Sequence, residues 1–175
     1  MDWSKAKTVL IAALLITNLI LCAFFAEEVK NRDQALKDAA EYAVSYAKGR
    51  GIKVDTALPT DKVRMSVLFV ELADEGDVLT RFKGKDVDVY GELGRKVVSG
   101  RSGGAAGELI PASTALIILT NRLSGEAGGI TIREVAPVYW LDAADVEPGA
   151  TQDTAVPAWR FRTDQGDFYV EGFVE

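Results

Sequence analysis

The side chains that could perform chemistry in this chain are few in kind. Histidine is absent, and the single cysteine, Cys22, lies inside an uncharged apolar segment. A Ser-His-Asp or Cys-His nucleophile system, a Cys/His zinc site and a disulfide framework therefore cannot be built from these residues. Any catalysis would have to depend on carboxylates, lysine or tyrosine.

Neither the glycines nor the acidic residues form a ligand motif. The segment 100–107 (GRSGGAAG) is followed by Glu108 instead of the Lys-Ser/Thr pair of a phosphate loop, and we expect a flexible loop there. No spacing places two carboxylates across a cleft, as glycoside hydrolysis requires. A solvated turn is favoured over an EF-hand for Glu71, Asp74, Glu75, Asp77, Asp86 and Asp88. The sequence predicts no metal, no cofactor and no enzymatic activity.

The segment 8–26 (TVLIAALLITNLILCAFFA) carries no charge and is long enough, at 1.5 Å per residue, to cross a hydrocarbon core of about 30 Å. We expect a retained transmembrane helix. The competing interpretation is a cleaved signal peptide, but the best cleavage position, after Ala26, has bulky Phe24 where a small residue is preferred. A lipoprotein signal is disfavoured because Leu21, directly before Cys22, is not small.

Charge predicts the orientation of the chain and the kind of partner. Lys5 and Lys7 precede the span, so the positive-inside rule makes residues 1–7 a cytoplasmic tail and residues 27–175 an extracytoplasmic domain of a single-pass cell-membrane protein. The net charge of the 175-residue chain is -6, and all of the acidic excess lies beyond residue 26. Such a surface disfavours nucleic acid and anionic lipid headgroups. The expected partner is a protein.

Small and polar residues of the span fall on one side of a helical wheel. At 100° per residue they occupy an arc of about 120°: Ser4, Thr8, Ala12, Asn18 and Cys22. Asn18 is costly against lipid but stabilising when it bonds a neighbouring helix, and small residues let helices approach closely. We interpret this arc as a partner-binding face. The alternative is that the helix tolerates a lone Asn and the small residues align by chance.

Beyond the span, periodicity predicts an α+β domain. One amphipathic helix is expected over 33–48, with Asp33 as N-cap and Gly49 and Gly51 as stops, and a second after Pro111, ending at Gly125. Strands are expected at 65–72, 86–90, 95–99, 130–141, 158–163 and 168–174. We predict an antiparallel sheet with two main helices, and the order allows two similar α-β-β-β halves.

Several side chains carry finer predictions. Residues 65–72 are apolar on both pleat faces, which favours a central strand, and Pro137 indicates an edge or a bulge. In the final hairpin Trp159 and Phe161 share the core face, and the alternating arginines are expected to pair with Glu171. Tyr42 and Tyr46 could form a contact stripe, but packing on the domain's own sheet is favoured.

Two terminal stretches resemble known families. The opening MDWSKAKTVLIAALLITNLIL resembles the N-terminus of the YycI (WalI) regulatory proteins through Met1, Asp2, Trp3, Lys5, Lys7 and Thr8. The closing PVYWLDA and PAWRFRTDQGDFYVEGF are similar to the last segment shared by the YycH and YycI families, with Pro157, Trp159, Gly166 and Tyr169 in register. The middle of the chain, 80–113, matches neither family.

The resemblance implies a Gram-positive cell and a membrane-anchored regulator of a two-component system for cell-wall homeostasis. Its partners would be the sensor histidine kinase and a YycH-like membrane protein, in a hetero-oligomer. No catalytic residue comes with it. Two alternatives remain open: a PepSY-like domain that binds a peptide or wall fragment, which a concave aromatic groove would support, and a cell-wall enzyme, which an apposed carboxylate pair would support.

Overall fold

The computed structural model describes residues 3–73, 81–82, 85–90, 96–124, 129–142 and 150–174. The chain divides into two compact units, residues 1–39 and 40–175. The first unit is helical, and the second combines the end of that helix with a sheet and a second helix.

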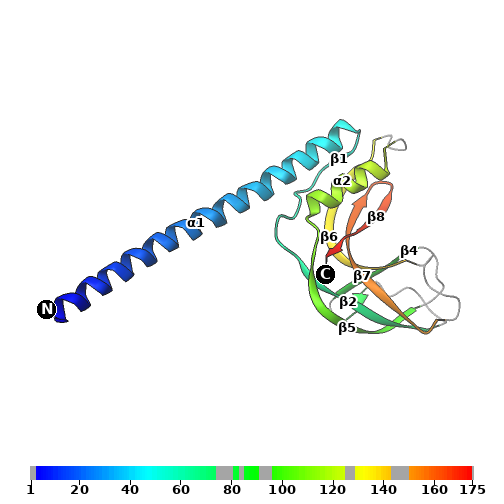
Figure 1. Ribbon diagram of the computed structural model, residues 1–175. Helices are drawn as coiled ribbons and strands as arrows, with labels where there is room; N and C mark the ends of the chain where they lie inside the picture. Colours follow the sequence, from blue (N-terminus) through cyan, green and yellow to red (C-terminus); the bar gives the residue numbers. More distant parts are fainter. Residues whose placement is uncertain are drawn as a thin grey trace. The chain divides into compact units, whose positions relative to one another are not determined.

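The N-terminal helix, α1, runs without a break over Trp3–Gly49 (Figure 1). The prediction that a separate helix begins at Asp33 is wrong. No glycine or proline occurs between Trp3 and Lys48, and the charged linker 27–33 consists mostly of residues that a helix accommodates well. Because α1 already supplies a carbonyl to each N–H there, Asp33 has no free helix end to cap.

Two glycines end α1, as predicted. Gly51 has a φ of 84° and donates its N–H to the carbonyl of Lys48, while Ile52 donates to the carbonyl of Ala47. This pair of bonds is a Schellman motif, which favours glycine at the left-handed position. Ile52 and Ala47 are both buried, so the cap also fixes α1 to the core.

The remaining elements are two groups of strands, one after each helix. After α1 come β1 (Lys53–Val54), β2 (Arg64–Ala73), β3 (Arg81–Phe82), β4 (Lys85–Tyr90) and β5 (Lys96–Leu109). After helix α2 (Ala112–Arg122) come β6 (Thr131–Asp142), β7 (Gln152–Thr163), β8 (Gly166–Glu171) and β9 (Phe173–Val174). The predicted α+β class, the strands and the helix after Pro111 are confirmed. The two α-β-β-β halves are not, because five described strands follow α1 and four follow α2.

The sheet is mixed and not purely antiparallel. Its main path is β3-β4-β6-β7-β2-β5-β9, with β1 added to β6 and β8 added to β7. The pairings of β6 with β1 and with β4 are parallel, which corrects the predicted sheet. Strand β2 lies between β7 and β5, so its predicted central position is confirmed.

The glycine-rich segment 100–107 is part of β5, and the predicted loop is wrong there. The register between β2 and β5 shows how the glycine-rich segment fits into the sheet. Val67 of β2 pairs with Gly103, but Met65 pairs with Gly107, so extra residues of β5 bulge out between the two pairs. Gly104, at a φ of 68°, provides the left-handed turn of this bulge. The backbone bonds to β2 hold the segment in a strand despite its composition.

Pro137 occupies a local edge inside the sheet. On one side β6 pairs with β7 along its length, and on the other it pairs with β1 at 131–132 and with β4 at 139–142. On that second side, no described residue pairs with β6 between the stretches that pair with β1 and with β4. A missing N–H costs no ladder bond at such a gap, which accounts for the proline.

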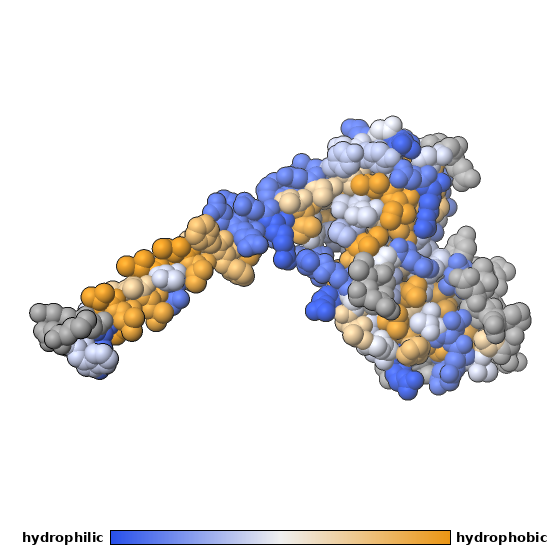
Figure 2. Space-filling view, viewed as in Figure 1, coloured by the Kyte–Doolittle hydropathy of each residue, from blue (hydrophilic) through white to orange (hydrophobic). Residues whose placement is uncertain are grey.

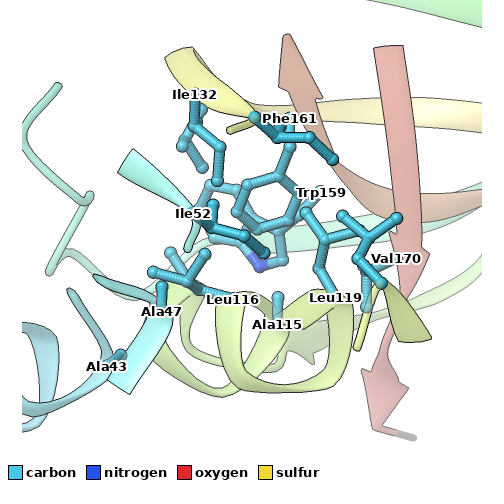
Figure 3. Close-up of a cluster of buried hydrophobic side chains, with 14 of the residues drawn as sticks. Ala43, Ala47, Ile52, Ala115, Leu116, Leu119, Ile132, Trp159, Phe161 and Val170 are labelled. Carbon is cyan, nitrogen blue, oxygen red and sulfur yellow. The ribbon is translucent and has the colours of Figure 1, made fainter. Parts of the chain in front are cut away.

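One main core joins both helices to the sheet (Figure 3). Trp159 and Phe161 of β7 are fully buried, as predicted, and pack toward α2 and the end of α1. Their neighbours in this core include Ala43, Ala47, Ala115, Leu116, Leu119, Ile132 and Val170. Ala43 and Ala47 are the buried residues that α1 contributes to this core. A second buried cluster is formed by Leu68, Val70, Leu72, Tyr139, Leu141 and Ala155.

Strands β7 and β8 form the final hairpin, and both of its arginines lie on β7. Thr163 pairs with Gly166 across a two-residue loop, so the predicted hairpin is confirmed. Arg160 and Arg162 contact Glu134 of β6, at 3.4 and 3.0 Å, instead of the predicted Glu171. The register of β7 with β8 explains this, because Glu171 pairs with Ala158, whereas Arg162 pairs with Asp167 and also contacts it at 3.7 Å.

Candidate partner-binding and ligand-binding sites

The predicted partner-binding face lies on the apolar half of α1. The structure places Ser4, Thr8, Ala12, Asn18 and Cys22 on one uninterrupted helix, so the helical-wheel arc applies along its length. The side chains of the last four are exposed, and that of Ser4 lies outside the described residues. Hydrophobic residues surround this half of the helix (Figure 2). The helix is long and apolar enough to cross a membrane, as an anchor or as a signal sequence.

Large aliphatic residues share the arc with the small ones. Ile11, Leu15 and Leu19 fall within the same 120°, and each is at least half exposed. The face is therefore mostly apolar, and small residues alone do not define it. Asn18 is its one amide, and this side chain sets the face apart.

Asn18 differs from the neighbouring polar residue of the span. The Oγ1 of Thr17 donates a 2.9 Å bond to the carbonyl of Ala13, which satisfies it within its own helix. The Asn18 amide has two donor hydrogens and a two-lone-pair oxygen, and no described residue bonds to it. An unbonded amide in hydrocarbon is costly. In a membrane, Asn18 is thus the side chain of this face that requires a partner.

A second exposed surface lies where α1 ends beside α2. Tyr42 is 64% exposed and stacks on Tyr46 at 6.3 Å between ring centroids, so the prediction that both tyrosines pack on the sheet is wrong for Tyr42. The Tyr46 hydroxyl donates a 2.7 Å bond to Oδ1 of Asn121. Arg50 lies over the Tyr46 ring and bonds Ser124. Alanines at 43 and 47 take the buried side, which turns Tyr42 outward.

A groove of about 640 Å³ lies over β5, β2 and β7. Register places five of its side chains on one face: Phe69 pairs with Arg101 and with Thr154, and Glu71 pairs with Gln152. Val70 and Asp153 complete its lining. The sequence predicts that Phe69 lies on a central strand that is apolar on both faces. Glu71 is the sequence signal for the exposure of Phe69. It lies two residues after Phe69, so both side chains point to the same face of the strand, and a charged residue there indicates that this face is exposed.

Comparisons of the chain with protein-family models, curated proteins and solved structures find no match. The segments from which the sequence predicts a YycI-like or YycH-like protein lie, within the described residues, on α1, on β6, β7 and β8 and at the start of β9. Of the closing residues, Trp159 is buried in the core, Pro157 belongs to β7, and Gly166 begins β8 directly after the hairpin loop.

Within the described part of the chain, no group of three metal-ligating side chains comes together. Of the predicted acidic turn, Asp74, Glu75 and Asp77 lie outside the described residues, as do the side chains of Asp86 and Asp88. Asp164 has an altered acidity: its Oδ1 accepts a 2.9 Å bond from the Thr131 N–H, which lowers the pKa of this carboxyl. That bond ties the hairpin turn to the start of β6, so its role is structural.

Proposed function

We propose that this chain is a membrane-anchored regulator that works through protein contacts and forms no product. In this proposal α1 is retained as a single-pass anchor, with residues 1–7 in the cytoplasm and the domain outside the cell. The partners are a sensor histidine kinase controlling cell-wall homeostasis and a YycH-like membrane protein. The observation that carries the proposal is Asn18, an amide of the apolar span with no described bonding partner.

The amide favours docking for a simple energetic reason. A lipid chain offers Asn18 no hydrogen bond, whereas a polar group on a second helix does, and such interhelical bonds contribute about 0.6–2 kcal/mol. Ala12 and Cys22 on the same arc allow that helix to come close. Binding of this kind shifts the equilibrium between kinase states by the difference in affinity for the two states.

Pull-down of the tagged full-length chain from its native membranes in mild detergent tests the proposal. We expect a sensor kinase or a YycH-like protein to be recovered, and Asn18→Leu to reduce that recovery severalfold. Thr17→Leu is the matched control, because Thr17 lies one residue away, outside the arc, and its hydroxyl is already bonded to Ala13. Equal recovery with both variants would refute the docking face, and absence of any membrane partner would refute the regulator.

Retention and orientation have their own test. In a Cys22→Ser background, Asp2→Cys should be protected from a membrane-impermeant maleimide in intact cells, and Asp167→Cys should react. The mass of the purified protein should include residues 1–26. Loss of those residues would establish a cleaved signal sequence instead.

The groove over β2 favours a second function, ligand binding by the domain. It provides a concave surface that contains one aromatic side chain, Phe69. It does not favour a wall enzyme. Glu71 pairs with Gln152 while Asp153 pairs with Val70, so the two lining carboxylates leave neighbouring strands on opposite faces of the sheet.

A further inference from the structure

The groove over β2 combines one aromatic ring with hydrogen-bonding groups of several kinds. Phe69 is 44% exposed although it lies mid-strand, between paired residues on both sides. Around it on the same face lie a guanidinium, a carboxylate, an amide and a hydroxyl, from Arg101, Glu71, Gln152 and Thr154. The groove volume of about 640 Å³ is within the roughly 300–1,000 Å³ usual for small-molecule sites.

The ring of Phe69 is held in place before any ligand arrives. It lies against the backbone of Gly103, where a Cβ would overlap the ring atoms. The guanidinium carbon of Arg101 lies 5.9 Å from the ring centroid. Covering a strand glycine with an aromatic ring also stabilises the sheet. A fixed ring loses little conformational entropy on binding, so it is a preorganised platform.

The polar groups select the class of ligand. Arg101 only donates, Glu71 only accepts, and Gln152 and Thr154 do both. Charges of both signs disfavour a strongly charged ligand, and a single aromatic residue among polar ones disfavours an apolar one. A sugar ring fits this set, because its hydroxyls donate and accept around the rim while its C–H face can lie on an aromatic ring.

We propose that the groove over β5, β2 and β7 binds a saccharide, stacked on Phe69 and hydrogen-bonded by Arg101, Glu71, Gln152 and Thr154. The site is independent of the α1 face, so it does not depend on the proposed regulatory function. The saccharide source is either a soluble oligosaccharide or the glycan of a cell wall, which share this chemistry.

Calorimetric titration of the full-length protein in detergent tests the proposal. The probes are the β-1,4-linked trimer of N-acetylglucosamine and maltotriose, and co-sedimentation with purified wall sacculi tests the polymer. We expect saturable binding of at least one probe. Phe69→Leu, which keeps an apolar cover on Gly103 but removes the ring, should raise the dissociation constant at least tenfold. Phe69→Tyr should change it less than threefold.

Val67→Ala is the matched control, because Val67 lies two residues earlier on the same face of β2 and does not line the groove. It should leave the dissociation constant within threefold, and thermal unfolding should show that every variant is folded. Binding of a trimer alone indicates a soluble ligand, and binding of sacculi indicates the wall glycan. No binding to any of these probes, or equal binding by folded Phe69→Leu, would overturn the proposal.

Discussion

The indole Nε1 of Trp159 donates a 2.7 Å hydrogen bond to the backbone carbonyl of Ile110. Trp159 belongs to the middle of β7, and Ile110 is the second residue before α2. The N–H of Ile110 in turn bonds the carbonyl of Gly172, between β8 and β9. One buried side chain thus connects the sheet, the entry to the second helix and the C-terminal strands.

We expect Trp159→Phe to lower the free energy of unfolding by about 2–4 kcal/mol, because it opens a cavity and leaves the Ile110 carbonyl without its partner. Urea unfolding of the full-length protein in detergent, followed by circular dichroism, measures this. Trp3→Phe is the control, since Trp3 lies outside the folded domain and should leave the transition unchanged. A loss below about 1 kcal/mol would show that the bond and the packing matter little.

Gly103→Ala should lower the free energy of unfolding by about 1–3 kcal/mol, because the new methyl group overlaps the Phe69 ring. In the double variant with Phe69→Ala the overlap disappears, so its loss should be smaller than the sum of the two single losses. Urea unfolding of all four proteins gives the coupling. Gly49→Ala, which meets open space, should be neutral or slightly stabilising, and additive losses would contradict the contact.

Tyr46→Phe should cost about 0.5–1.5 kcal/mol of folding free energy, because it removes the bond to Asn121 but keeps the ring. Tyr42→Ala should change stability by less than about 0.5 kcal/mol, since most of that side chain is exposed. Thermal and urea unfolding distinguish the two. A large loss with Tyr42→Ala would mean that the exposed ring contributes to folding.

Asp164 should make a pH-dependent contribution to stability. Its pKa is lowered in the folded state by the bond from the Thr131 N–H, so its stabilisation is complete above the unfolded value of 3.8 and disappears as pH falls through the lower folded value. The stability difference between the native protein and Asp164→Ala should therefore be largest near neutral pH and shrink toward pH 2. A difference that stays constant from pH 7 to pH 2 would exclude this cause.

Local patterns in the sequence determined much of this protein. The length and lack of charge of 8–26 predicted an apolar helix, Gly49 and Gly51 predicted the end of α1, and alternation at 158–163 placed Trp159 and Phe161 in the core. These features depend on periodicity and on the conformational freedom of single residues. Both properties are visible in a short stretch of the sequence. The arc that contains Asn18 follows in the same way from the helical repeat.

Only the tertiary structure decided which segments pair and which side chains meet. The segment 100–107 has the composition of a loop, yet the backbone of β2 holds it in a strand. Arg160 and Arg162 contact Glu134 because β6 lies beside β7, an order that no local pattern encodes. The ring of Phe69 is positioned in the groove by Gly103 and Arg101, which are more than 30 positions away in the sequence. Contacts between distant residues depend on strand order and register, which the whole packed core sets.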